Sequence, residues 1–234
     1  MEHLSGGLTL DIPPGAFPLS TDSMVLGHFA KLPKNARVLD LGAGCGTLGL
    51  LLCARWGNCH ITGVEIDPVS HAGALENIRR NGLEDRMESI CADLRSLPIA
   101  PGGFDVCVSN PPYFTGGPAS RDHGTARRED LCSLEDVVAA ASKALKYGGD
   151  FFLVHRPERL GQLCALGGKY GLEAKRLLLV RHRSDGPVAL ILVALRKGAN
   201  PGLTWEEISL HHPNGSPTED YNAIYHFATG ETSL

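Results

Sequence analysis

Short apolar runs rich in β-branched residues recur from Ala36 onward, separated by stretches with helical spacing. Such alternation is typical of a parallel sheet whose strands are joined by crossover helices. Pro68 and Pro157 suit a first helical turn, and Asn81-Gly82 suits a helix end. The pattern predicts strands at 37–41, 60–64, 87–91, 105–108, 150–154, 176–180 and 188–194, and helices at 20–32, 47–56, 68–81, 133–146 and 157–169.

The last two predicted strands follow each other without a helix, because the turn sequence Ser184-Asp185-Gly186-Pro187 joins them. One of the two must therefore run antiparallel to the rest. We expect a doubly wound α/β sheet of seven strands, mostly parallel, with one antiparallel strand in a C-terminal hairpin. The tail after Asn200 is acidic and turn-rich, and Trp205 and Ile208 are its candidates for docking on the core.

Composition narrows the class of protein. The chain has 234 residues, of which 43% are apolar, which suits one domain with at most a small appendage. Its cleanest uncharged apolar run, residues 41–54, is too short for a membrane span, and its first residues do not resemble a signal peptide. The seven cysteines are scattered without a CxxC or CxxH pair, which favours a reducing cytoplasm and neither disulfides nor a metal site.

A glycine-rich loop follows the first predicted strand of this series. It contains Gly42, Gly44 and Gly46 and leads into a helix. Glycine allows a tight turn and a close backbone approach to a ligand, and the helix start offers unpaired N–H groups. Two other interpretations compete at this point, namely a purely structural turn and a dinucleotide site. The spacing GxGxG, rather than GxGxxG, favours a ligand without a pyrophosphate.

Two carboxylates follow the next predicted strands. Glu65, at the end of the second strand, is placed to accept both hydroxyls of a ribose, and we prefer it to Asp67, whose position before Pro68 suits a helix cap. Asp93 lies at the end of the third strand. It is a further candidate for a ligand-binding carboxylate, and the alternative interpretation is that it caps a turn.

The fourth predicted strand leads into Asn110-Pro111-Pro112-Tyr113, followed by Phe114. The lone pair of an amine conjugated to a ring or carbonyl is delocalised, which makes the amine a poor nucleophile. The Asn110 carboxamide oxygen and a nearby backbone carbonyl can each accept one amine proton, which localises the lone pair and directs it toward an electrophile. The prolines stiffen the loop, and Tyr113 offers a face on which a planar acceptor can stack.

These two motifs resemble those of the class I S-adenosylmethionine-dependent methyltransferases. Residues 38–46 match the family's form (V/I)LDxGxGxG, and Asn110–Tyr113 match the (D/N/S)PP(Y/F) motif of the amino-methyltransferases. The resemblance implies a Rossmann-like fold, S-adenosylmethionine as cofactor without a metal, and catalytic roles for Asn110, Pro111 and Tyr113. It implies the following cofactor-binding residues: Thr21, Asp40, Gly42, Ala43, Gly44, Gly46, Glu65, Ile66, Asp93, Leu94 and Asn110.

The N-terminal part narrows the resemblance. Only 37 residues precede Val38, too few for the helical domain that leads the glutamine methyltransferases, and residues 15–27 with Ser-Thr-Asp-Ser resemble the bacterial tRNA1(Val) adenine-N6-methyltransferase family. We therefore expect residues 1–35 to close over the cofactor, 36–198 to form the methyltransferase domain and 199–234 to extend it. The alternative substrates are ribosomal RNA, a DNA adenine and a protein glutamine. The alternative without catalysis is an S-adenosylmethionine-binding RNA chaperone.

Charge is unevenly distributed along the chain, whose formal net charge is −4. Residues 121–200 hold 14 basic and 9 acidic side chains, whereas residues 201–234 hold 5 acidic and no basic ones. A basic segment directly after the acceptor motif favours phosphate contacts. We expect an RNA partner, most simply a tRNA, and no membrane or obligate protein partner. The candidate substrate-binding residues are Pro112, Phe114, Arg121, Arg127 and Arg128.

Overall fold

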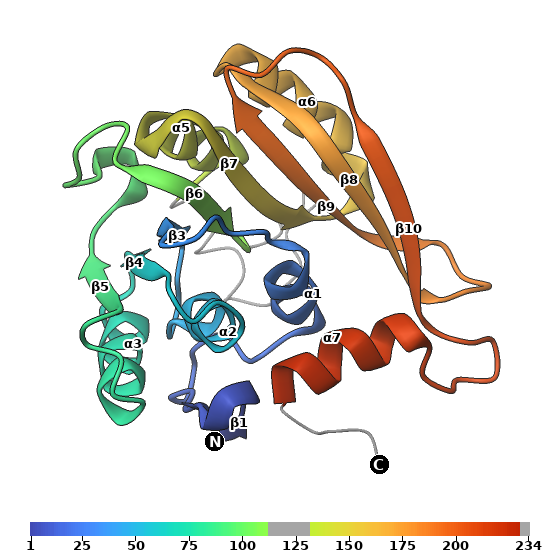
Figure 1. The fold of residues 1–234 in the computed structure, drawn as a ribbon, viewed down its shortest axis with the longest axis horizontal. Coiled ribbons are helices and arrows are strands. Elements are labelled where there is room, and N and C mark those ends of the chain that lie inside the picture. Colours follow the sequence, from blue (N-terminus) through green and yellow to red (C-terminus); the bar gives the residue numbers. More distant parts are fainter. Residues whose placement is uncertain (112–131, 230–234) are drawn as a thin grey trace.

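One large sheet forms the centre of the molecule (Figure 1). The computed structural model describes residues 1–111 and 132–229, with side chains up to residue 225. Within these residues the sheet has eight strands in the order β10-β8-β9-β7-β6-β3-β4-β5. Only β9 runs against its neighbours, pairing antiparallel with both β7 and β8. The expected antiparallel strand in a C-terminal hairpin is therefore confirmed.

The elements follow the predicted alternation. A small hairpin and a helix precede the main sheet, and a strand and a helix follow its hairpin. The strands are β1 Glu2–His3, β2 Thr9–Leu10, β3 Arg37–Leu41, β4 His60–Glu65, β5 Met87–Cys91, β6 Phe104–Ser109, β7 Leu145–His155, β8 Leu172–Arg183, β9 Val188–Lys197 and β10 Thr204–His211. The helices are α1 Thr21–Phe29, α2 Thr47–Arg55, α3 Pro68–Arg80, α5 Leu134–Ala144, α6 Leu160–Lys169 and α7 Glu219–Thr229, with 3-10 turns η1 Ser5–Gly7, η2 Leu94–Ser96 and η3 Pro157–Arg159.

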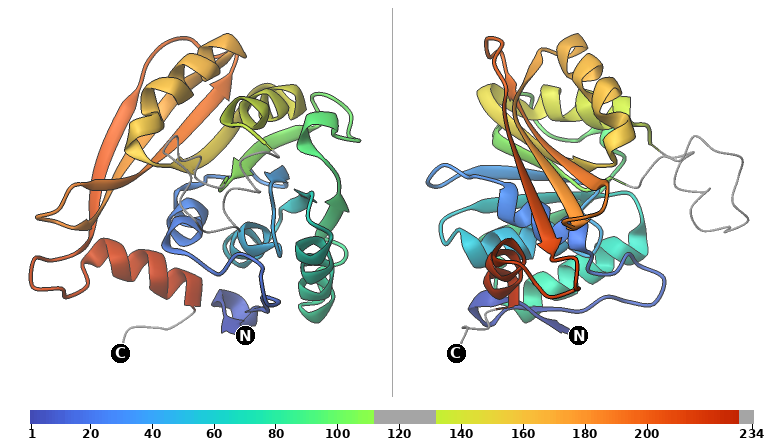
Figure 2. Two further views of the ribbon diagram at one scale, coloured as in Figure 1. Left: turned by 180° about the vertical axis from the view of Figure 1, so that it is seen from behind. Right: turned by 90° about the vertical axis from the view of Figure 1, so that its right-hand side faces the viewer.

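Helices cover both faces of the sheet, as the right-hand panel of Figure 2 shows. An apolar layer of buried side chains lies between the sheet and the helices on each face. Helices α1, α2, α3 and α7 contribute to one layer, with Leu26, Leu50 and Ile224 buried in it. Helices α5 and α6 contribute to the other, around Phe151 and Leu163. No helix among the described residues is long and apolar enough to cross a membrane. Helices on both faces leave the carboxyl edge of the sheet for ligands.

The tail departs from the sequence expectation. Residues 204–211 form an eighth strand, β10, which pairs parallel with β8 at the edge of the sheet, so the expected count of seven was one too low. Trp205 is 65% exposed and does not dock the tail, whereas Ile208 does pack on the core. Because Trp205 is exposed together with Glu206 and Glu207, the first half of β10 lacks the alternation that reveals a half-buried strand.

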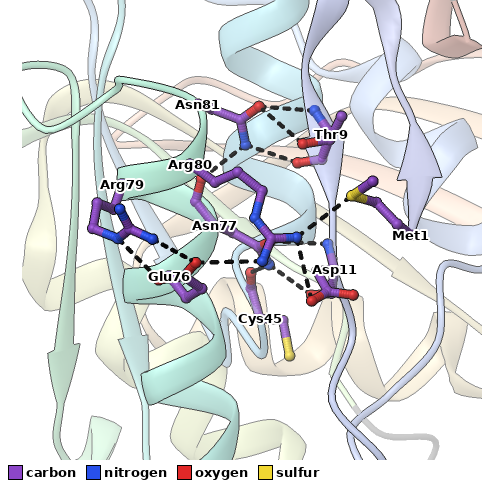
Figure 3. Close-up of polar contacts among 9 residues, drawn as sticks. All are labelled: Met1, Thr9, Asp11, Cys45, Glu76, Asn77, Arg79, Arg80 and Asn81. Carbon is purple, nitrogen blue, oxygen red and sulfur yellow. Dashed lines mark hydrogen bonds and ion pairs between the residues drawn. The ribbon is translucent and has the colours of Figure 1, made fainter.

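The segment from Thr9 to Asp11, here called the N-terminal strap, lies along α3 (Figure 3). Two asparagines one helical turn apart hold it there. Asn81 accepts from the Thr9 N–H (2.8 Å) and donates to the Thr9 carbonyl (2.7 Å), and Asn77 does the same with Asp11 (2.9 and 2.8 Å). Four residues along a helix and two residues along an extended chain each span about 6 Å, so the spacing of Asn77 and Asn81 matches that of Thr9 and Asp11. The two carboxamides therefore act like the backbone edge of a strand. Asn77 also donates to the Cys45 carbonyl in the glycine loop (3.0 Å).

Candidate cofactor and acceptor site

The candidate residues gather where the strand order reverses. Strand β3 lies between β4 and β6, with parallel pairing on both sides, so the loops after these three strands leave the sheet at the same edge. In a doubly wound sheet, this switch point is where ligands bind. The glycine loop follows β3, Glu65 ends β4, and Asn110 follows β6.

The glycine loop needs its glycines for two reasons. Gly42, Gly44 and Gly46 have φ of 76°, 55° and 82°, in the left-handed region that favours glycine. At Gly46, a Cβ atom would also lie 2.8 Å from the Met87 Cε. The N–H groups of Gly42 and Ala43 both donate to the Val64 carbonyl (2.9 and 3.0 Å), which fixes the loop against β4. Helix α2 begins directly behind it, with its unpaired N–H groups.

Asp40 is the most unusual side chain of the site. It is 1% exposed, and neither carboxylate oxygen has a well-formed hydrogen bond among the described residues; the Gly49 backbone N–H contributes only a weak one. Burial, and then the charge of Glu65, raise the pKa of Asp40 to about 7, with a weaker opposite influence from the Gly49 amide. A buried polar group normally has a partner. Asp40 therefore fits a cationic ligand group or an ordered water beside the loop.

Glu65 connects the glycine loop to the start of α3. Its carboxylate accepts from the Gly44 N–H and from the Asp67 N–H, both at 2.8 Å. Asp67 caps α3 by accepting from the Ser70 N–H (2.9 Å), as expected for an Asp before a helical proline. Ile66, between them, is 40% exposed and leaves an apolar surface beside Glu65.

Two other expected cofactor residues are occupied by protein partners. Asp93 caps η2 and forms an ion pair with Arg95 (2.5 Å), and this hydrogen-bonded partner lowers the pKa of the Asp93 carboxyl. Leu94 begins the same turn. The Thr21 hydroxyl lies 3.0 Å from the Tyr225 hydroxyl of α7. Tyr225 stacks on Tyr221 with 4.1 Å between ring centroids, so the start of α1 is fastened to the tail helix.

Asn110 lies at the end of β6 and contacts α1. Its Nδ2 donates to the Ser23 Oγ at 3.0 Å, and Ser23 is 5% exposed. One residue earlier, Ser109 donates to the Leu41 carbonyl (2.8 Å), which ties the end of β6 to the end of β3 just before Gly42. Pro111 is buried. The remaining expected acceptor and RNA contacts lie outside the described residues: Pro112, Tyr113, Phe114, Arg121, Arg127 and Arg128.

The basic side chains that follow are largely engaged within the protein. Arg181 pairs with Glu207 of the tail strand (2.5 Å) and Lys169 with Glu135 (2.5 Å). The Arg176 guanidinium lies 4.4 Å from the centre of the Phe29 ring. The acidic tail therefore neutralises part of the basic segment that precedes it, which the charge count along the chain did not reveal.

Three residues that contact the site were not among those expected from the sequence. Ser23 lies in the Ser-Thr-Asp-Ser stretch, but nothing in that stretch indicates that it faces Asn110. Asn77 and Tyr225 are each far in sequence from the loops they hold. Two asparagines on one helix face, Asn77 and Asn81, are the only signal that could have suggested a bound backbone segment.

Comparison with known proteins identifies the family of the chain. The family model of the methyltransferase small domain matches residues 20–166. The chain belongs to this family. It is 29% identical over 214 residues to the tRNA1(Val) (adenine(37)-N6)-methyltransferase of Serratia proteamaculans, covering 89% of this chain and 82% of that one. It is 31% identical over 183 residues to the protein of that name from Bacteroides fragilis, covering 76% and 77%.

The fold of this methyltransferase also has solved counterparts. The structure of a predicted O-methyltransferase from Agrobacterium tumefaciens superposes with a TM-score of 0.74 at 21% identity, covering 88% of this chain and 96% of that one. S-adenosylmethionine is the cofactor of the enzyme. The residues present fit it, because the left-handed glycine loop leaves room for a close backbone approach and the buried Asp40 carboxylate has no well-formed hydrogen bond within the described part of the chain.

Proposed function

We propose that the enzyme methylates the N6 amine of an adenine in structured RNA, most simply an anticodon-loop adenine of a tRNA. The observation that carries this proposal is the position of Asn110 and Pro111 at the end of β6, next to the strand that leads into the glycine loop. The names of the related proteins support the same acceptor. RNA is the partner that we propose. The tail is proposed to belong to the same domain, since β10 extends the sheet and α7 packs beside it.

The chemistry of an adenine amine explains why an amide is required there. The lone pair of the amine is delocalised into the ring, so it is a poor nucleophile. The Asn110 Oδ1 accepts one amine hydrogen and a backbone carbonyl of the same loop accepts the other, which draws the nitrogen toward sp3 geometry. The cofactor, when bound, would supply the methyl group from its sulfonium and leave as S-adenosylhomocysteine, and the amine would lose one proton after the transfer. The protein contributes mainly orientation to the displacement.

The partly unpaired bases of an anticodon loop reduce the cost of bringing the adenine into the site, which is a few kcal/mol for a paired base. We propose that Tyr113 stacks on the flipped base and that Pro112 and Phe114 line its pocket. Arg121, Arg127 and Arg128 would contact phosphates beside it, because they directly follow the acceptor motif.

Methyl transfer from labelled cofactor to separate pools of tRNA, ribosomal RNA, DNA and protein tests the proposal. We expect label in the tRNA pool, and N6-methyladenosine as the modified nucleoside after digestion. Label that appears only in protein, or in a nucleoside other than N6-methyladenosine, would refute it. Unmodified tRNA transcripts are the appropriate substrate, because native tRNA already carries modifications.

A further inference from the structure

The contact between Asn110 and α1 has a consequence for catalysis. An amide side chain has a donor end and an acceptor end that occupy similar volumes, and rotation by 180° exchanges them. Only one orientation suits an amine acceptor, because the amine also presents hydrogens. With Oδ1 facing the amine a hydrogen bond forms, whereas with Nδ2 facing it two donors oppose each other.

We propose that Ser23 is a positioning residue that holds the Asn110 carboxamide in its productive orientation. This inference rests on the proposed function, since it requires an amine acceptor. The Asn110 Nδ2 donates to the Ser23 Oγ at 3.0 Å. With the Nδ2 end engaged, the Oδ1 end is directed away from α1 and available to the amine.

The geometry of the first turn of α1 makes Ser23 an acceptor for Asn110. Ser20 caps this helix, and its Oγ accepts from the Ser23 N–H at 3.3 Å. The two hydroxyl oxygens lie 3.4 Å apart, and because the Asn110 Nδ2 can only donate to Ser23, we assign the Ser23 hydroxyl hydrogen to the Ser20 oxygen. The lone pairs of Ser23 then remain for the Asn110 amide.

Both ends of this contact are held in place. Ser23 is 5% exposed, and the residue two before it, Thr21, is fastened to Tyr225. On the other side, the Ser109 Oγ donates to the Leu41 carbonyl and fixes the backbone that leads into Asn110. A side chain held between fixed elements is preorganised, so little ordering remains for the moment of reaction.

The first test compares Ser23→Ala with Ser70→Ala. Ser70 is a matched control, because it occupies the same position in α3, is 6% exposed, and likewise hydrogen-bonds the cap of its helix through its N–H and hydroxyl. We expect Ser23→Ala to lower kcat by about tenfold with unchanged cofactor Kd and RNA KM, since one hydrogen bond of about 1.4 kcal/mol is lost. Ser70→Ala leaves kcat unchanged.

The second test repeats Ser23→Ala in an Asn110→Asp background under single-turnover conditions, in which slow transfer is still counted. A carboxylate has two equivalent oxygens and needs no choice of orientation. Loss of Ser23 should therefore change the rate of that variant by less than about twofold. The same tenfold loss in both backgrounds would show that Ser23 only packs α1 and would overturn the inference.

The two proposals fail in different ways. A wild-type enzyme that labels no RNA adenine contradicts the proposed function. A wild-type enzyme that labels adenine, with an equally active Ser23→Ala variant or one whose cofactor Kd and melting temperature change together with kcat, contradicts the role of Ser23 alone.

Discussion

The two halves of the sheet differ in whether their charged side chains are paired. Around β3 and β4, the Asp40 carboxylate is buried without an ion pair or a well-formed hydrogen bond among the described residues. Around β7 to β10, charges are paired: Arg196 with Asp150 (2.8 Å), and Arg181 with Glu207 (2.5 Å). A buried carboxylate that is poorly satisfied persists where a ligand is to bind, whereas locally neutralised charges hold strands together.

This difference changes the interpretation of the basic residues in the segment 121–200. From the sequence, the excess of cations in residues 121–200 favoured phosphate contacts after the acceptor motif. Within the described part of that segment, Lys169, Arg181 and Arg183 each have a carboxylate partner. The ion pairs remove these three cations from the candidate phosphate contacts, and the arginines proposed for that role are those that directly follow the acceptor motif.

The largest effect is expected in the first half, at the acceptor residue. Asn110→Ala removes the carboxamide that localises the amine lone pair, so kcat should fall at least about a hundredfold. Calorimetry should give an unchanged cofactor Kd, because the glycine loop and Asp40 remain. A variant as active as the wild type would contradict the mechanism, and one that no longer binds cofactor would assign Asn110 a different role.

The next effect concerns the unpaired carboxylate, Asp40. Because its pKa is raised from 3.8 to about 7, the folded protein holds a proton that the unfolded chain has released between these values. The free energy of unfolding should therefore fall as pH rises from about 4 to 7 and then level off, by at most about 4 kcal/mol. Asp40→Asn removes this dependence, which denaturant titrations at several pH values measure.

The same substitution should have the opposite effect on ligand binding. The cofactor carries positive charge, so it favours the ionised Asp40, and wild-type affinity should rise with pH up to about 7. Asp40→Asn should weaken cofactor binding by about tenfold or more and flatten its pH profile. A variant that binds as tightly as the wild type at pH 7 would show that this carboxylate serves the fold and not the ligand.

The features that could be predicted from the sequence are those whose interactions join residues close together in the chain. The glycine loop, the ends of β3 to β6 and the antiparallel β9 could be predicted, because strand periodicity, turn residues and capping act within a few positions. Strand β10 was missed because an edge strand has little apolar alternation to reveal it. Contacts such as Asn110 with Ser23, or Thr21 with Tyr225, join residues 87 and 204 positions apart, and no local pattern encodes them.

A smaller effect tests whether the site depends on the strap. Asn77 is fully buried and bonds both Asp11 and the Cys45 carbonyl, whereas Asn81 bonds the strap without touching the glycine loop. Asn77→Ala should cost about 2 to 4 kcal/mol of unfolding free energy and weaken cofactor binding, and Asn81→Ala about 1 to 2 kcal/mol with cofactor Kd unchanged. Equal losses of affinity in both variants would mean that the strap as a whole, and not Asn77, supports the loop.

The smallest effect is expected in the half whose charges are paired. Glu207→Gln breaks the ion pair between Glu207 and Arg181, whose side chains are 37% and 28% exposed respectively. The unfolding free energy should therefore fall by less than about 1 kcal/mol, and by less still in high salt. Methyl transfer to RNA should be unaffected, because β10 lies at the far edge of the sheet from β4 and β5. If kcat/KM for RNA instead changed severalfold while cofactor Kd stayed constant, Arg181 and its partner would belong to the RNA-binding surface, and the division between a ligand half and a structural half would move toward β10.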